Sequence, residues 1–185
     1  MPLMPAGAPA TLQHDDIARR IPHQGSMCLL ERVTAWDGGQ ITCEASSHRA
    51  ANNPLRAYGR LGASCGIEYA AQAMAVHGAL IAEAFSSADG TSPAPQAGYL
   101  ASVRSVTLHV EILDDLSGSL TVHAERMSGD AGTILYSFSL HAGPALLLSG
   151  RAVVVLNAAS LALPTAGPAS KPGNPAARTS TANTL

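Results

Sequence analysis

A glutamate and a glutamine lie one helical turn apart inside a Gly/Ala-rich apolar stretch of the chain. Glu68 and Gln72 belong to residues 66–72, Gly-Ile-Glu-Tyr-Ala-Ala-Gln, so their side chains project together from a helix. An ionised carboxylate beside an apolar surface is costly unless it is paired or used in chemistry. Glu68 is therefore the first candidate for acid or base chemistry, and a solvated glutamate on an amphipathic helix is the alternative.

The helix that carries this pair is predicted over residues 61–84. One face of it should be buried, because apolar residues recur there at helical spacing: Ile67, Ala70, Ala71, Met74, Gly78 and Ile81. The next stretch, 86–96, is polar and contains proline, so a loop is expected there.

The remaining pattern predicts a short helix over 12–20 and six strands. Two strands, 27–36 and 40–47, are joined by an Asp-Gly-Gly turn. Four more follow the long helix, at 99–110, 119–127, 133–141 and 145–156. We expect an α+β domain in which one long central helix is wrapped by a curved antiparallel sheet. Such a sheet has open edges, so a dimer that continues the sheet is a reasonable expectation.

Composition limits the domain count and the partners. The chain has 185 residues, enough for one domain with flexible ends. Residues 1–10 are rich in Pro and Ala, and residues 158–185 are rich in Pro, Ala, Ser and Thr. Both are expected to be disordered tails, which leaves 11–157 as the folded unit. A net charge of −2 gives no sign of binding to nucleic acid or to an anionic membrane.

The cysteines and the apolar stretches bear on metals, compartment and membranes. The three cysteines show no metal-ligand spacing, so no metal site is expected. Residues 1–10 do not resemble a signal peptide, and a reduced, cytoplasmic setting fits best. The apolar stretch 144–163 is interrupted by Arg151 and Asn157, which argues against a membrane span.

Four segments together resemble the hot-dog-fold 3-hydroxyacyl-[acyl-carrier-protein] dehydratases. Residues 21–33, Ile-Pro-His-Gln-Gly-Ser-Met-Cys-Leu-Leu-Glu-Arg-Val, resemble the family's leader, where Pro-His-Arg and some apolar residues precede Asp-Arg-Val. Residues 53–55, Asn-Pro-Leu, resemble the Asn-x-Pro-Phe before the family's helix, and 66–72 resemble that helix. Residues 98–104 resemble a later strand that lines the acyl tunnel. The resemblance spans about 14–156 and is closest to the dehydratase-like proteins of aryl polyene lipid gene clusters.

This resemblance implies a hot-dog fold and a reaction. The reaction would convert a 3-hydroxyacyl thioester on acyl carrier protein into the trans-2-enoyl thioester, in fatty acid or aryl polyene type synthesis. The implied acid is Glu68, oriented by Gln72. Backbone N–H groups near Cys65 and Gly66, at the start of the helix, would hold the thioester oxygen. Asn53 and Pro54 would contact substrate, and no cofactor is implied beyond the phosphopantetheine arm that carries the substrate.

One departure from the family concerns the catalytic base. The family places a histidine in a Pro-Gly-His-Phe-Pro stretch before the helix, whereas residues 53–60 of this chain contain none. The base could come from a histidine-bearing hot-dog paralogue across a dimer interface. It could instead be His23 or His48, or the chain could be a non-catalytic subunit of a dehydratase heterodimer. A homodimer and a heterodimer both remain open.

A hot-dog acyl thioesterase is the alternative enzyme. There, a carboxylate at a similar place on the helix activates water to attack the thioester. Release of the thiol without loss of the 3-hydroxyl would favour this alternative.

Overall fold

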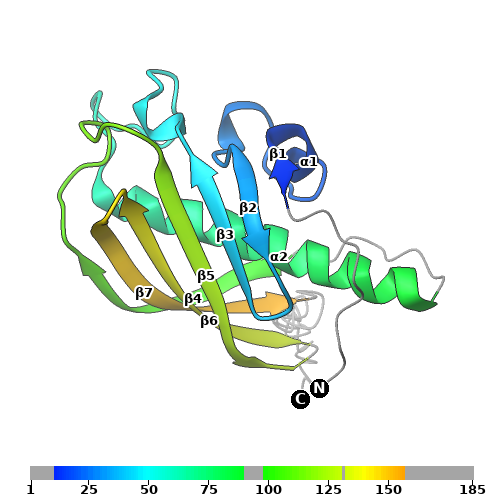
Figure 1. Ribbon diagram of the computed structural model, residues 1–185. Helices are drawn as coiled ribbons and strands as arrows, with labels where there is room; N and C mark the ends of the chain where they lie inside the picture. Colours follow the sequence, from blue (N-terminus) through cyan, green and yellow to red (C-terminus); the bar gives the residue numbers. More distant parts are fainter. Residues whose placement is uncertain (1–10, 90–97, 131, 157–185) are drawn as a thin grey trace, which may run out of the picture.

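One long helix, α2 (Gly66–Asp89), lies in the concave face of a seven-stranded antiparallel sheet (Figure 1). The protein was analysed as a computed structural model, which describes residues 11–89, 98–130 and 132–156. The strand order is β1-β2-β3-β5-β6-β7-β4. The strands are β1 (Leu12–Gln13), β2 (Arg32–Trp36), β3 (Gln40–Ala45), β4 (Gly98–Leu108), β5 (Leu120–Gly129), β6 (Thr133–Ala142) and β7 (Ala145–Leu156). The expected α+β architecture is therefore confirmed.

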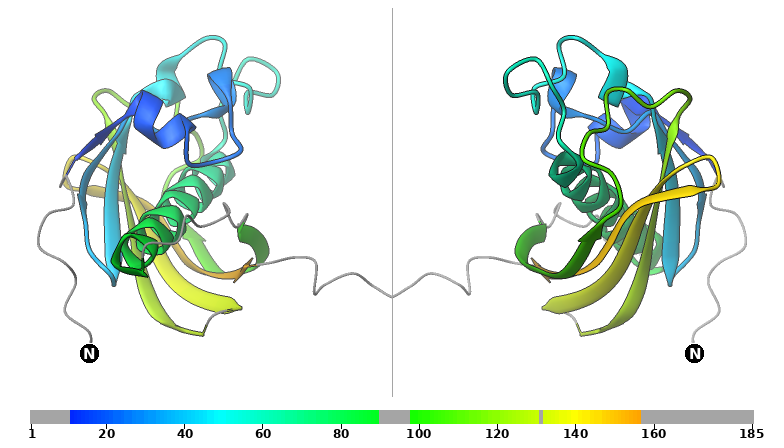
Figure 2. Two further views of the ribbon diagram at one scale, coloured as in Figure 1. Left: turned by 90° about the vertical axis from the view of Figure 1, so that its right-hand side faces the viewer. Right: turned by 90° about the vertical axis from the view of Figure 1, so that its left-hand side faces the viewer.

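The sheet curves around α2, as the end-on views in Figure 2 show. Alternate residues of each strand face the helix, because side chains along a strand alternate between the two faces. On β6, the buried residues Ile134, Tyr136, Phe138 and Leu140 follow this alternation. The buried residues of the helix include the small residues Gly66, Ala70 and Ala73, which let neighbouring side chains approach closely.

Gly66 marks the closest approach between helix and sheet. A methyl group added at its Cα would collide with the Leu148 side chain, and it would lie 2.8 Å from Cδ2 of Leu140. Both leucines are fully buried, so neither side chain has free space to move into. A side chain at the first residue of α2 would therefore require these two leucines to shift.

The helix begins and ends later in the chain than predicted. The pattern predicts 61–84, whereas α2 starts at Gly66 because Leu61 and Ala63 pair with another segment. The N–H of Ala63 donates to the carbonyl of Glu111, and the N–H of Leu113 donates to the carbonyl of Leu61. A short 3-10 turn, η3 (Ala63–Cys65), then leads into the helix. The C-terminal end runs into the predicted loop 86–96, of which 90–96 lie outside the described residues.

The N-terminal elements also differ from their predictions. The predicted helix 12–20 is the short strand β1 followed by α1 (His14–Ala18). The predicted strand 27–36 begins only at Arg32, after the 3-10 turn η1 (Gly25–Met27). Met27 and Leu29 bond to the Gln72 side chain of α2 instead of to a neighbouring strand. The predicted tails 1–10 and 158–185 lie outside the described residues.

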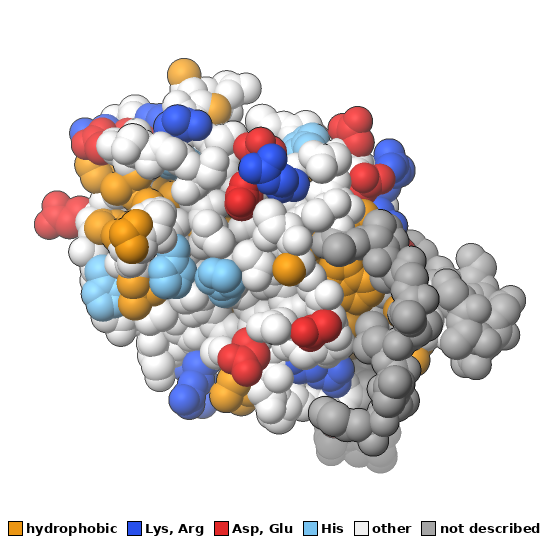
Figure 3. All heavy atoms as spheres, in the orientation of Figure 1, with side chains coloured by type: hydrophobic (Ala, Val, Ile, Leu, Met, Phe, Trp, Pro, Cys, Tyr) orange, Lys and Arg blue, Asp and Glu red, His pale blue; other side chains and the backbone are white. Residues whose placement is uncertain are grey.

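The outer face of the sheet is mostly polar. Figure 3 views the molecule from this side and shows histidine side chains gathered over part of it. Two of the chain's histidines, His123 on β5 and His141 on β6, meet edge to face with ring centroids 5.5 Å apart. Within the described part of the chain, no helix is long and apolar enough to cross a membrane.

Candidate active site

His23 and Glu68 form a direct pair. Nε2 of His23 lies 3.0 Å from Oε1 of Glu68, and both side chains are partly exposed, at 26% and 31%. Glu68 belongs to the first turn of α2, while His23 belongs to the leader between α1 and η1. The carboxylate and the imidazole come from segments far apart in the sequence, and the leader lies over the start of the helix.

Gln72 fixes the position of the Glu68 carboxylate. Its Oε1 accepts the backbone N–H of Leu29 at 2.9 Å, so the opposite atom of the amide must be the NH₂ group. That Nε2 donates to the carbonyl of Met27 at 2.8 Å and to Oε1 of Glu68 at 3.0 Å. Gln72 is fully buried, and the amide can only donate to the carboxylate.

The two groups that hold Glu68 bind the same oxygen. Both His23 Nε2 and Gln72 Nε2 contact Oε1. Oε2 makes no hydrogen bond to any of the described residues. One carboxylate oxygen is therefore held in place, and the other is free for a ligand.

A cavity of about 660 Å³ opens beside this pair. The leader, α2, β4 and β7 form its walls, and its lining includes His23, Glu68, Ala71, Ala75, Tyr99, Leu100 and Val154. Its size falls in the range of small-molecule sites, which is roughly 300–1,000 Å³. The wall combines a few polar groups at one place with small or apolar side chains elsewhere, an arrangement that suits an acyl chain with one reactive end.

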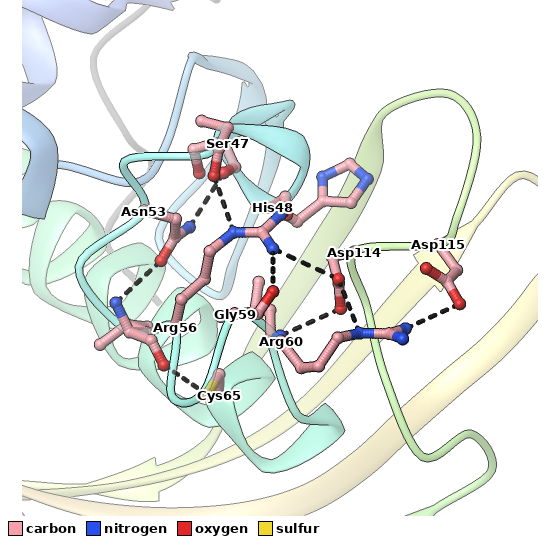
Figure 4. Close-up of polar contacts among 12 residues, drawn as sticks. Ser47, His48, Asn53, Arg56, Gly59, Arg60, Cys65, Asp114 and Asp115 are labelled. Atoms are coloured by element: carbon pink, nitrogen blue, oxygen red, sulfur yellow. Dashed lines mark hydrogen bonds and ion pairs between the residues drawn. The ribbon is translucent and has the colours of Figure 1, made fainter.

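The loop before α2 is held by its own polar network (Figure 4). Asn53 is buried; its Nδ2 donates to the carbonyl of Ser47 at 2.9 Å and to the Tyr69 hydroxyl at 3.0 Å, and its Oδ1 accepts the N–H of Leu55. The Cys65 thiol points back to the carbonyl of Leu55. Every polar atom of the Asn53 side chain is thus used to shape this loop.

Arg56 and Arg60 attach the same loop to the segment that follows β4. Arg56 contacts the carbonyls of His48, Ala50 and Gly59, and Arg56 and Arg60 both pair with Asp114. Oδ1 of Asp114 also accepts the Leu61 N–H at 3.0 Å. This N–H, together with the two guanidinium groups, holds the pKa of Asp114 below its usual value. The network holds both guanidinium groups in place, although the Arg60 side chain remains half-exposed.

The sequence profile of the ApeP dehydratases matches residues 15–162. This chain belongs to the ApeP dehydratase family. No curated protein sequence matches the chain.

Among solved structures, the chain is similar to the dehydratase heterocomplex ApeI:P from Xenorhabdus doucetiae. The TM-score is 0.64 at 21% identity, over 79% of this chain and 91% of that chain. A thioesterase from Staphylococcus aureus has a TM-score of 0.47 at 13% identity, over 68% and 91% of the two chains. A thioesterase from Haemophilus influenzae has a TM-score of 0.48 at 11% identity, over 79% and 91%. The predicted hot-dog fold and dehydratase family are confirmed.

In this ApeP family member, the structure brings three of the predicted residues together. His23, Glu68 and Gln72 form one connected group at the cavity wall. The second histidine named from sequence, His48, lies elsewhere. It is fully buried in the 3-10 turn η2 (Ser47–Arg49), and its Nε2 contacts the carbonyl of Leu116 at 3.2 Å. Burial lowers the pKa of His48.

The four residues predicted to bind substrate are not in the cavity lining. Asn53 shapes the loop, Pro54 is exposed on it, and Gly66 faces the sheet leucines. The N–H of Cys65 donates to the carbonyl of Gly62, and that of Gly66 donates to the carbonyls of Ala63 and Ser64. The predicted thioester contacts at Cys65 and Gly66 therefore have no free donor in this structure.

Several cavity residues carried no chemical signal in the sequence. Ala71 and Ala75 contribute through their small size, and Arg19 and Arg20 through their place directly before the leader. Tyr99 and Leu100 belong to the segment that resembled the tunnel strand, and that resemblance was the only signal for them. Within the described residues, no group of three potential metal ligands lies close together.

Proposed function

We propose that this chain is the acid-bearing subunit of a hot-dog dehydratase, and that Glu68 and His23 together remove water from 3-hydroxyacyl thioesters carried on acyl carrier protein. The observation that carries the proposal is the 3.0 Å contact between His23 Nε2 and Glu68 Oε1 at the wall of a 660 Å³ cavity. Membership of the ApeP dehydratase family supports the reaction class. The pathway that fits this family is aryl polyene or fatty acid type synthesis.

Dehydration takes one proton from the substrate and gives one proton to the leaving hydroxyl, so the His23–Glu68 pair ends the reaction with the same number of protons as at the start. In the reactive arrangement Glu68 holds a proton on Oε2, the oxygen that His23 and Gln72 leave free, and Nε2 of His23 has turned from Oε1 toward the substrate with its lone pair available. His23 then takes the proton from C2 of the substrate, and Glu68 gives its proton to the departing 3-hydroxyl, which leaves as water. The imidazole then turns back and returns its proton to the Glu68 carboxylate, which is protonated again for the next turnover.

Gln72 supports this cycle by holding one oxygen of the acid. Because its amide donates to Oε1, the second oxygen is directed to substrate. The small side chains Ala71 and Ala75 leave room for an acyl chain beside it. The carrier's phosphopantetheine arm would deliver the thioester, and no other cofactor takes part in this scheme.

A hot-dog partner subunit is part of the proposal. The similar ApeI:P structure is a heterocomplex, and the cavity of this chain borders β4, which is an edge strand among the described strands. A second subunit placed along β4 would cover Tyr99 and Leu100, which are 53% and 41% exposed. The chemistry proposed for His23 and Glu68 stays within this chain.

The test is a dehydration assay on a 3-hydroxyacyl carrier protein, with enoyl product followed by mass. Wild type is compared with Glu68→Gln and His23→Gln, both alone and co-expressed with an ApeI-type subunit. Each substitution should lower the rate by about 10²–10⁴-fold, the usual range for losing a general acid or base. Glu125→Gln, which changes a glutamate exposed on β5, is the matched control and should keep the wild-type rate.

Three outcomes contradict the proposal. Wild-type rates for Glu68→Gln in the complex would make the chain a non-catalytic partner. A loss in Glu68→Gln but none in His23→Gln would assign the base to the partner subunit. Release of free thiol without enoyl product would favour the thioesterase alternative.

A further inference from the structure

Two arginines lie directly opposite each other on the last two strands of the sheet. Arg104 on β4 is the register partner of Arg151 on β7, and both side chains are exposed. The neighbours of Arg151 on the helix-facing side, Ala152 and Val154, are buried. Because strand side chains alternate, the two guanidinium groups point to the outer face of the sheet.

Like charges directly opposite each other on neighbouring strands destabilise a sheet. Within the described residues, Arg104 and Arg151 have no carboxylate partner, whereas five other arginines do: Arg19, Arg20, Arg32, Arg56 and Arg60. In the same cross-strand row Arg151 is followed by Ser137 on β6 and Glu125 on β5. That carboxylate is two strands away, about 10 Å by the usual strand spacing. The positive pair is thus left uncompensated by its own sheet.

The pair lies on the free edge of the sheet. Strand β4 bonds to β7 on one side and to no described strand on the other. It is 11 residues long and exposes Tyr99 and Leu100, and an open edge of this kind is a template for pairing with another chain. Arg104 lies next to the middle of the strand. Any strand that adds along β4 therefore brings its own residues close to Arg104.

We propose that Arg104 and Arg151 select the partner subunit by charge. They favour a hot-dog subunit whose edge strand carries carboxylates facing this pair, and they oppose pairing between two copies of this chain. In an antiparallel, two-fold pairing of β4 with a second β4, the axis runs near the middle of the strand. The two Arg104 residues then fall on the same face close to that axis, and four guanidinium groups gather there.

This inference rests on the partner subunit in the proposed function, but its test does not use activity. Sedimentation velocity measures the mass of the wild-type chain, whose monomer is 18.9 kDa. The Arg104→Glu/Arg151→Glu double variant serves as a surrogate acidic partner. The mass measurement can therefore succeed when the dehydration assay fails, and the dehydration assay can succeed when the mass measurement fails.

Each protein alone should remain a monomer at low salt, and the equimolar mixture should form a 1:1 dimer. Raising NaCl from about 0.01 M to about 1 M shortens the Debye length from about 30 Å to about 3 Å, so the mixed dimer should weaken by tenfold or more. Arg49→Glu, an exposed charge reversal away from β4, is the control and should not dimerise with wild type. Circular dichroism checks that the variants are folded.

A second variant covers the case in which the double reversal does not fold. Arg104→Gln/Arg151→Gln removes the repulsion without adding charge, so it should self-associate more strongly than wild type at low salt. A wild-type homodimer that is insensitive to salt overturns the inference. A mixture that stays monomeric, or a glutamine variant that associates no better than wild type, also overturns it.

Discussion

The imidazole of His23 and the carboxylate of Glu68 meet at 3.0 Å although 45 positions separate them in the chain. The leader brings one group and the first turn of α2 brings the other. Gln72 ties the two segments together, since it bonds to the backbone at Met27 and Leu29 as well as to Glu68. The position of the acid thus depends on the same amide that docks the leader onto the helix.

Replacing Gln72 should lower stability as well as activity. Gln72→Leu leaves the buried N–H of Leu29 without an acceptor, which costs about 1–3 kcal/mol. Urea unfolding measures this loss, and the dehydration assay should show a lower kcat with a smaller change in KM. Gln40→Leu, at an exposed position, is the control and should stay within about 0.5 kcal/mol of wild type. An unchanged urea midpoint for Gln72→Leu would contradict this account.

Alanine substitutions at two glycines of α2 should change the stability of the protein in opposite directions. Gly66→Ala pushes a methyl group into Leu148 and Leu140, and overpacking of this kind costs about 1–3 kcal/mol. Gly78→Ala meets no atom within 4 Å and should gain up to about 1 kcal/mol from the better helix propensity of alanine. Thermal or urea unfolding of the two variants, compared with wild type, measures both changes in stability. Equal effects of the two substitutions would show that close packing at Gly66 is unimportant.

Stability should fall on mild acidification because of His77. Its Nε2 donates to the carbonyl of Asp37 at 2.7 Å, and its Nδ1 lies 2.9 Å from the Tyr136 hydroxyl, which it accepts when the ring is neutral. Burial lowers the pKa of His77. Below pH 6.5 the unfolded chain takes up a proton that the folded ring does not, so stability falls by at most about 1.4 kcal/mol per pH unit. The loss stops once the pH passes below the folded pKa.

Urea midpoints between pH 7.5 and pH 5 measure this slope. His77→Gln should flatten it, whereas His109→Gln, which removes an exposed histidine, should leave it unchanged. His48 is also buried with a lowered pKa, so part of the slope should survive in the His77 variant. A His77 variant with the full wild-type slope would rule out this group as a source.

The carboxylate of Asp114 should contribute more to the free energy of unfolding than the carboxylate of Asp115. Asp114→Asn weakens the pairing with Arg56 and Arg60, whereas Asp115→Asn removes one contact of an exposed side chain with Arg60. Because the folded pKa of Asp114 is lowered, its contribution is present above about pH 4 and is lost as the pH falls through the folded value. Asp114→Asn should lower the urea midpoint at pH 7 and reduce the acid sensitivity. Equal midpoints for the two variants would contradict this prediction.

Local sequence patterns determined the long helix, the strands after it and the neighbouring positions of Glu68 and Gln72. Helical spacing and strand alternation are properties of consecutive residues, so they can be read without a structure. The bounds of α2 could not, because Leu61 and Ala63 pair with residues about fifty positions later. The same holds for Met27 and Leu29, whose bonds go to Gln72.

The site itself needed the tertiary structure. From sequence alone the base could come from a partner subunit or be His23 or His48, and only the folding of the leader over α2 brings His23 to Glu68. Asn53, Cys65 and Gly66 have the residue types of a binding loop, yet their polar groups and surfaces are used in packing. Residue type and spacing determine which groups are present. Long-range packing decides which of those groups remain free at a cavity, because every buried donor and acceptor must first find a partner.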